Sequence, residues 1–178
     1  MTYFDEIKRT MEWLAQKPDV LFLGQAVEYQ GTVMSNTLKD VSKDKLLEMP
    51  VAEEMQMGIS TGLAINGIVP VSIYPRWNFL LLATNQLVNH LDKIAIYSNR
   101  EFKPKVIIRT SVGSKRPLDP QIQHTGDFTL PFRMMLDTVH VMLLKKPSWA
   151  FPVYKEAYER TDGVSTIIVE YGDYYNEK

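Results

Sequence analysis

The sequence predicts an α/β fold, a three-layer sandwich in which a mainly parallel, doubly wound sheet has helices on both faces. Short apolar runs recur along the 178 residues, and longer stretches with helical periodicity separate them. The short runs are apolar throughout rather than alternating, which is typical of parallel strands covered on both faces. With 45% hydrophobic and 23% charged residues, a chain of 178 residues suits one globular domain, and we expect residues 1–178 to form it.

Helical and extended patterns alternate along the chain. Residues 2–16 carry apolar side chains on one side and precede Pro18, so they are expected to form an amphipathic helix. Residues 20–23 (Val-Leu-Phe-Leu) are expected to be a buried strand, with a loop over residues 24–31. Residues 37–48 are polar and are expected to be irregular or weakly helical. Four more strands are expected at residues 68–74, 105–109, 139–143 and 166–170, with helices at 79–96, 128–136 and 148–160.

The predicted helix within residues 49–67 organises the rest of the chain. Pro50 suits its first turn, where the missing N–H costs nothing, and Gly67 is part of a C-terminal stop signal. Glu53 falls in that first turn. Taken by itself, Glu53 reads as a surface carboxylate that the helix dipole stabilises.

The faces of this helix differ in character. Met55, Ile59 and Leu63 repeat every four residues and form one apolar stripe. Gly58 and Gly62 lie one turn apart, where each glycine costs about 1 kcal/mol relative to alanine. We therefore expect something to pack very close to the glycine face.

Composition excludes several classes of function. Lys plus Arg number 20 and Asp plus Glu number 21, which gives no electrostatic case for binding nucleic acid or an anionic membrane. The absence of cysteine excludes disulfides and thiol nucleophiles. His90, His124 and His140 lack metal-ligand spacing, so no metal site is expected in this chain. No apolar run could span a bilayer, and Asp5 and Glu6 stand where a signal core would be, so a cytoplasmic location is expected.

In a parallel sheet the carboxyl ends of the strands share one edge, and ligands bind there. The loops after the first three strands and the start of the helix at residues 49–67 are expected to meet at that edge. The long loop over residues 111–127 is also expected to be functional, because loops of this length inside compact domains usually are.

Six short motifs follow one another along the chain. They are residues 18–24 (Pro-Asp-Val-Leu-Phe-Leu-Gly), 50–53 (Pro-Val-Ala-Glu), the glycine-bearing 58–67, 70–79 (Pro-Val-Ser-Ile-Tyr-Pro-Arg-Trp-Asn-Phe), 85–90 (Asn-Gln-Leu-Val-Asn-His) and 123–124 (Gln-His). In this order and spacing, from about Tyr3 to Tyr171, they resemble the pyrimidine-binding domain of transketolase-like thiamin diphosphate enzymes. The closest likeness is to the beta subunit of the decarboxylating component of 2-oxo acid dehydrogenase complexes. The resemblance implies the thiamin diphosphate-binding fold.

The resemblance also implies roles for individual residues. Glu53 stands where the family has the glutamate of its Pro-Ile-Ser-Glu motif, which activates the cofactor through a ring nitrogen of the aminopyrimidine. Trp77 and Phe79 are both candidates for the aromatic ring that stacks on the pyrimidine, with core packing as the alternative for each. His124 matches the histidine of the family's Gln-His-Ser and would orient substrate or shuttle a proton, with a solvated loop histidine as the alternative.

The chain also departs from the family pattern. The family often has acidic residues where this chain has Gln25, Ala26 and Ile73, and these changes bear on substrate type and on proton transfer. The family's Gly-Asp-Gly motif, which holds diphosphate and magnesium in a separate domain, does not occur, and residues 172–174 (Gly-Asp-Tyr) do not replace it. We therefore expect the diphosphate-binding domain and the C-terminal domain to be absent, the thiamin diphosphate to be shared with a partner chain, and the magnesium to be held by that partner.

The resemblance therefore predicts a subunit of a thiamin diphosphate-dependent oxidoreductase or transferase that is inactive alone. It would act in 2-keto acid decarboxylation or ketol transfer, as a homodimer or hetero-oligomer with a subunit carrying the diphosphate-binding domain. Two alternatives are open: a non-catalytic assembly or regulatory subunit that retains the fold, and an unrelated doubly wound α/β binding module. For the last, the position of Glu53 is decisive, because a cofactor-activating residue must lie at the carboxyl edge of the sheet.

Overall fold

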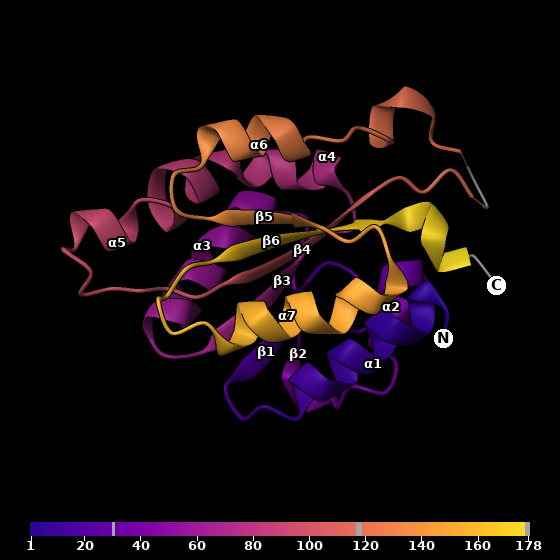
Figure 1. Cartoon of the computed structure of the whole chain (residues 1–178), viewed down its shortest axis with the longest axis horizontal. Helices are drawn as coiled ribbons and strands as arrows, with labels where there is room; N and C mark the ends of the chain where they lie inside the picture. Colours follow the sequence, from indigo (N-terminus) through magenta and orange to yellow (C-terminus); the bar gives the residue numbers. More distant parts are fainter. Residues whose placement is uncertain (30, 117–118, 177–178) are drawn as a thin grey trace.

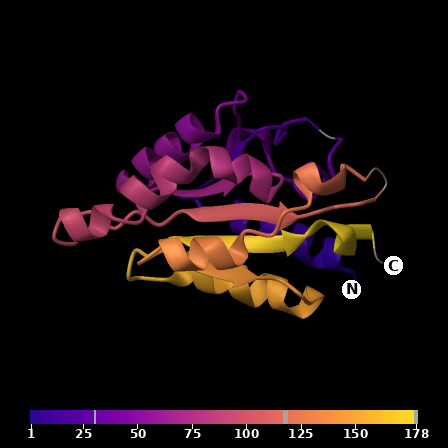
Figure 2. The same ribbon diagram turned by 90° about the horizontal axis from the view of Figure 1, so that it is seen from above.

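The computed structural model describes residues 1–29, 31–116 and 119–176; Gln30 of the first expected loop and residues 117–118 of the long loop lie outside them. Six strands in this part of the chain form one sheet, in the order β2-β1-β3-β4-β6-β5, and every neighbouring pair is parallel. Figure 2 shows β4 and β6 side by side along the middle of the molecule. The strands are β1 (Val20–Gly24), β2 (Leu46–Glu48), β3 (Val69–Ile73), β4 (Ile107–Val112), β5 (His140–Leu143) and β6 (Thr166–Tyr171).

Helices cover both faces of this sheet (Figure 1). One apolar core lies between the sheet and the face that carries α1 (Tyr3–Ala15), α2 (Val33–Asn36) and α7 (Ala150–Glu159). The second lies on the opposite face, under α3 (Glu53–Ile65), α4 (Trp77–Leu80) and α6 (Thr129–Met135). The predicted three-layer α/β fold with a parallel sheet is thereby confirmed.

Two segments differ from the sequence prediction. Residues 46–48 form the edge strand β2 rather than irregular chain; three residues with partly exposed side chains are too few to show a strand pattern. The helix expected over residues 79–96 is broken into α4, a 3₁₀ turn (Leu81–Ala83), a π-helical turn (Gln86–Leu91) and α5 (Ile94–Tyr97). Such π-helical turns are frequent near functional sites.

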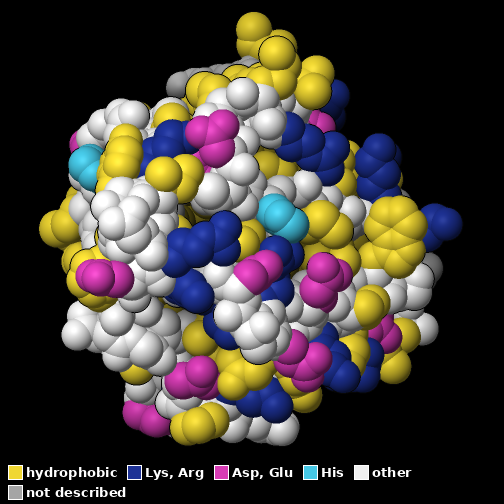
Figure 3. All heavy atoms as spheres, turned by 60° about the vertical axis from the view of Figure 1, so that its left-hand side comes forward, with side chains coloured by type: hydrophobic (Ala, Val, Ile, Leu, Met, Phe, Trp, Pro, Cys, Tyr) yellow, Lys and Arg dark blue, Asp and Glu magenta, His cyan; other side chains and the backbone are white. Residues whose placement is uncertain are grey.

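One face of the molecule is mixed in charge. Figure 3, in which the side carrying α5 comes forward, shows Lys and Arg interspersed with Asp and Glu rather than gathered into a patch of one sign. In the described ranges, no helix is both long and apolar enough to cross a membrane.

The inner face of α3 combines the apolar side chains of Met57 and Ala64 with buried polar ones. Gln56 donates from Nε2 to Ser72 Oγ (3.1 Å) and to the Ile73 carbonyl oxygen (3.0 Å), and Ser60 donates to Ser72 Oγ (2.9 Å). All four residues are buried. Because buried polar groups must be hydrogen-bonded, these bonds determine which side of α3 faces the sheet.

The apolar stripe of α3 is therefore turned outward, not into the core. The side chain of Met55 is 46% exposed, and Ile59 and Leu63 are only half-buried. A Cβ atom on Gly62 would meet no described atom within 4 Å, and one on Gly58 would meet only a side-chain oxygen at 3.9 Å. The close packing partner expected on this face is not found within the described chain.

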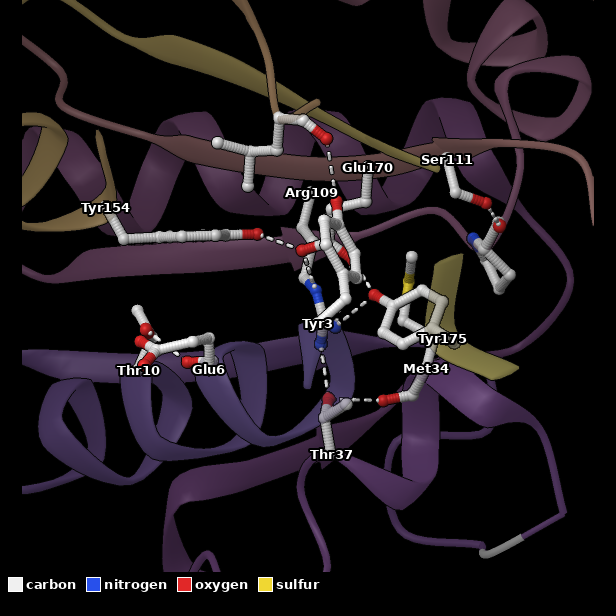
Figure 4. Close-up of polar contacts among 12 residues, drawn as sticks. Tyr3, Glu6, Thr10, Met34, Thr37, Arg109, Ser111, Tyr154, Glu170 and Tyr175 are labelled. Atoms are coloured by element: carbon white, nitrogen blue, oxygen red, sulfur yellow. Dashed lines mark hydrogen bonds and ion pairs between the residues drawn. The ribbon is translucent and has the colours of Figure 1, made fainter. Parts of the chain in front are cut away.

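A buried ion pair crosses the centre of the sheet (Figure 4). Arg109 on β4 donates from Nε and Nη2 to the two carboxylate oxygens of Glu170 on β6, at 2.8 and 3.1 Å. Tyr154 donates to the same carboxylate at 2.5 Å, and Tyr175 also bonds to it. The remaining guanidinium nitrogen donates to Thr37 (2.9 Å), so both buried charges are surrounded by partners.

Asp92 fastens the end of the π-helical turn to the chain that enters β5. Its buried carboxylate accepts backbone N–H groups from Asp137 (3.0 Å), Thr138 (2.8 Å) and Val139 (2.9 Å), and the ammonium of Lys93 (2.6 Å). Burial alone would raise the pKa of Asp92, but these hydrogen bonds outweigh burial and lower the pKa from 3.8 to about 2.

The lowered pKa of Asp92 predicts a pH dependence of stability. A carboxyl group whose pKa is depressed by folding stabilises the protein above its unfolded pKa, and this contribution is lost as the pH falls through the folded value. We expect the difference in free energy of unfolding between wild type and Asp92→Asn to narrow by about 2 kcal/mol from about pH 6 to about pH 2, measured by urea titration. The exposed Asp119→Asn serves as control and should show no such narrowing. A constant difference for Asp92→Asn down to pH 2 would contradict the prediction.

Candidate functional site

The carboxyl ends of β1, β3, β4 and β6 meet at one edge of the sheet, and the candidate site lies there. β1 ends at Gly24, where a Cβ atom would come within 2.5 Å of the Ile73 carbonyl oxygen of β3. Only glycine permits this approach, because any side chain would collide with the neighbouring backbone. The close approach places the next residue, Gln25, beside the start of α3.

A single carboxylate shapes the loop that follows β1. Glu48, the last residue of β2, accepts the backbone N–H groups of Ala26 (2.6 Å), Val27 (2.8 Å) and Glu28 (3.0 Å). Three such bonds hold a loop that would otherwise expose its donors. Sequence reasoning missed Glu48, because its only signal was an acidic residue just before the organising helix.

Glu53 is the first residue of α3 and lies at this edge of the sheet, as the sequence predicts for a residue that meets a ligand there. Its side chain is 5% exposed, and its carboxylate accepts one side-chain hydrogen bond, from Gln25 Nε2 at 3.2 Å. Tyr74 donates its hydroxyl to the Glu53 carbonyl oxygen (3.3 Å), and burial raises the pKa of Tyr74, so this donor keeps its proton. A carboxylate offers about four acceptor positions, so Glu53 retains acceptor capacity for a ligand.

Glu53 opens into a groove of about 800 Å³ along the outward face of α3. The groove is mainly apolar apart from its acidic end. We call it the α3 groove; its lining includes Glu53, Met55, Gly58, Ile59, Leu82 and Gln86.

The two aromatic candidates point to different places. Trp77 is fully buried, and its ring lies 4.8 Å from that of Phe132 in the core under α6. Phe79 is half-buried, lines a second cavity and has its ring centroid 5.4 Å from that of His124. The structure thus brings Phe79 and His124 together and leaves Trp77 among core side chains.

His124 is held by Arg76, whose Nη1 donates to the His124 carbonyl oxygen at 2.9 Å. The imidazole Nδ1 is buried and has no hydrogen-bond partner among the described residues. An unsatisfied buried nitrogen beside a half-buried aromatic ring suits a site completed by a ligand or a water molecule.

The second cavity has a volume of about 310 Å³ and lies over the ends of β1, β3, β4 and β6. Gln25 lines it and also bonds to Glu53, so Gln25 separates this cavity from the α3 groove. We call it the Arg76 cavity; its lining includes Gln25, Thr32, Arg76, Phe79, Ser111 and Tyr175. Within the ranges that the structure covers, no group of three or more His, Asp or Glu side chains could hold a metal ion.

The relatives found by comparison with known proteins agree with the sequence resemblance. No protein-family model matches the chain. The 2-oxoisovalerate dehydrogenase subunit beta of Bacillus subtilis is 26% identical over 117 residues, which are 64% of this chain and 36% of that protein. A pyruvate dehydrogenase E1 component subunit beta of Gracilaria tenuistipitata is 32% identical over 120 residues, or 65% of this chain and 37% of that protein. The chain is a distant homologue of these beta subunits.

The aligned regions cover little more than a third of the curated beta subunits, 36% and 37% of their lengths. Among solved structures, a chain described as "Split gene transketolase, inactive beta4 tetramer" superposes with a TM-score of 0.73. The match covers 97% of this chain and 52% of that chain, at 16% sequence identity. It shows that the whole described domain has the transketolase-like fold.

The role of Glu48 can be tested at the loop that presents Gln25. Glu48→Gln keeps the shape of the side chain but removes its charge, which weakens charge-assisted hydrogen bonds. We expect the amide protons of Ala26, Val27 and Glu28 to exchange with solvent about tenfold faster or more, measured by NMR. The exposed Asp44→Asn, just before the same strand, is the matched control. Unchanged exchange in Glu48→Gln would mean that the loop does not depend on this carboxylate.

Proposed function

We propose that this chain supplies the pyrimidine-binding half of a thiamin diphosphate site, in which Glu53 activates the cofactor. The observation that carries the proposal is the position of Glu53, a buried carboxylate with spare acceptor capacity at the carboxyl edge of the sheet. The distant homology to dehydrogenase beta subunits and the transketolase-like fold support it.

The residues present fit an aminopyrimidine. Glu53 could accept a hydrogen bond from a protonated ring nitrogen, since Gln25 occupies only one of its acceptor positions. Phe79 offers a half-exposed aromatic ring at the same edge, and a flat ligand ring would stack on it. We assign the stacking role to Phe79 rather than Trp77, because the Trp77 ring has no exposed surface.

When bound, thiamin diphosphate would supply a carbon nucleophile for a 2-keto substrate, and the residues of this chain would hold and orient its aminopyrimidine. In the proposed mechanism, Glu53 holds a proton at the pyrimidine nitrogen and so favours proton loss at that carbon. Gln25 orients the Glu53 carboxylate through its amide N–H, and the fixed start of α3 prevents the side chain from turning to solvent. His124, beside Phe79, would orient the substrate or carry a proton.

The diphosphate and the magnesium ion would be held by a partner subunit. The outward face of α3 suits such a partner, because it carries Met55 (46% exposed) and, across the α3 groove, Leu82 (62% exposed). Large exposed apolar side chains along one groove are typical of an interaction surface. Association through this face would cover the α3 groove and exclude water from Glu53.

The catalytic role of Glu53 is tested in the complex with a subunit that carries Gly-Asp-Gly. Glu53→Gln should fold and still allow cofactor binding, but it should slow proton loss from the thiazolium carbon by roughly 10²–10⁴-fold. The measurement is hydrogen–deuterium exchange at that carbon, followed by NMR. Glu54→Gln is the matched control: Glu54 is exposed and bonds to Asn85 and Gln86, so its loss should change the rate little. Equal rates for wild type and Glu53→Gln would leave the chain as a non-catalytic scaffold that retains the fold.

The association surface has its own test. Met55→Glu places a charge in the apolar part of the α3 groove, where burial against a partner would be costly. We expect it to weaken self-association, or association with the partner subunit, by at least about tenfold in analytical ultracentrifugation. Tyr97→Glu introduces the same charge on exposed α5, away from this groove, and should have no effect. Equal association of Met55→Glu and wild type would place the interface elsewhere.

A further inference from the structure

The Arg76 cavity contains a cation that forms no hydrogen-bonded ion pair with a carboxylate of the described residues. Arg76 Nη1 donates to the carbonyl oxygens of His124 (2.9 Å) and Ser114 (3.5 Å), whereas Nε and Nη2 make no hydrogen bond to a described residue. No acidic side chain lines the cavity in the part of the chain that the structure describes. The carboxylate of Asp173 is close enough to act on the charge of Arg76, but it accepts the backbone N–H of Lys115 instead (2.9 Å).

The guanidinium is partly withdrawn from water. Burial lowers the pKa of Arg76, and the attraction of Asp173 opposes this only in part. Such a group is stabilised by an anion that takes up its unused N–H donors. The Nε and Nη2 donors of arginine form a planar fork that matches two oxygens of a carboxylate or a phosphate.

The other polar groups of the cavity already have partners. The hydroxyl groups of Ser111, Ser114 and Tyr175 donate to other protein oxygens. The amide N–H of Gln25 is directed to the carboxylate at the start of α3. The fork of Arg76 is therefore the charged group in this cavity with donors to spare, and the second amide N–H of Gln25 could assist it.

We propose that the Arg76 cavity binds an oxyanion group, a carboxylate or a phosphate, of the substrate. Its volume of about 310 Å³ is at the lower end of the range for small-molecule sites. Gln25 and Phe79 line it, so a molecule anchored by Arg76 would lie next to the end of the α3 groove that holds Glu53. The assignment to the substrate rests on the proposed function, whereas oxyanion binding itself does not.

Titration of the 178-residue chain in the absence of cofactor tests this site. The probes are 2-oxobutyrate for the carboxylate and inorganic phosphate for the phosphate, followed by the amide NMR signals of Gln25, Phe79 and Gly113. We expect saturable shifts at these amides with at least one probe. Arg76→Met should weaken binding by about tenfold or more, and Arg76→Lys should weaken it less, because it keeps the charge but loses the fork.

Arg116→Met is the matched control. It removes the same charge from an exposed side chain that does not line the cavity, so the affinity should be unchanged. A preference for 2-oxobutyrate would indicate that the substrate is a 2-oxo acid. A preference for phosphate would indicate that the substrate is a phosphorylated ketose. Either result supports an oxyanion site at Arg76. The proposal is overturned if wild type shows no saturable shifts, if Arg76→Met binds as wild type does, or if Arg116→Met loses as much affinity.

Folding of each variant is checked by circular dichroism, since Arg76 also holds the His124 backbone. If Arg76→Met does not fold, the comparison of wild type with Arg76→Lys decides the outcome. The titration needs neither partner nor cofactor, so its result is independent of the exchange experiment on Glu53. Equal exchange rates for wild type and Glu53→Gln, together with Arg76-dependent binding, would remove the cofactor role and leave the oxyanion site.

Discussion

The ion pair between Arg109 and Glu170 constrains the centre of this fold. Both side chains are fully buried, and separating two buried charges costs several kcal/mol, so β4 and β6 must keep the register that joins them. Burial disfavours the charge on Arg109, but the adjacent carboxylate outweighs burial and raises the pKa of Arg109. Tyr154 of α7 and Tyr175 near the described C-terminus complete the network. Because Tyr175 also lines the Arg76 cavity, the buried pair fixes one wall of the candidate site.

The polar side chains on the inner face of α3 determine which residues its outer face presents to a partner. The hydrogen bonds of Gln56 and Ser60 to β3 turn the apolar stripe and the two glycines outward. An outer face that carries Met55 and lacks side chains at Gly58 allows another chain to approach the helix closely. Glu53 lies on the buried side of α3 with Gln56 and Ser60, bonds to Gln25 at the end of β1, and also lines the α3 groove. The orientation of the helix therefore couples the proposed partner surface to the proposed catalytic group.

The sequence pattern was sufficient to predict most of the fold, because the hydrophobic periodicity of strands and helices is a property of short stretches of chain. The edge strand β2 was missed, since three residues carry too little pattern. Sequence alone did not establish which side of α3 faces the sheet, and in the structure hydrogen bonds to Ser72 hold its polar side inward. Trp77 and Phe79 could not be separated by sequence, as their difference arises from contacts with Phe132 and His124, more than forty positions away along the chain. The Arg76 cavity could not be foreseen, since four strand ends contribute to it.

The departures from the acidic residues of the family pattern have a common effect in the structure: each one removes a negative charge from this edge of the sheet. At the position where the resembled family often has an acidic residue, Gln25 donates a hydrogen bond to Glu53. Two neighbouring carboxylates would repel each other and titrate as a coupled pair, whereas an amide leaves Glu53 a single carboxylate with a neutral donor. Ile73, at another such position, is buried and adds no charge. With acids replaced and Arg76 lining the adjacent cavity, this edge of the sheet is less negative than the family pattern implies, which favours an anionic group beside Glu53.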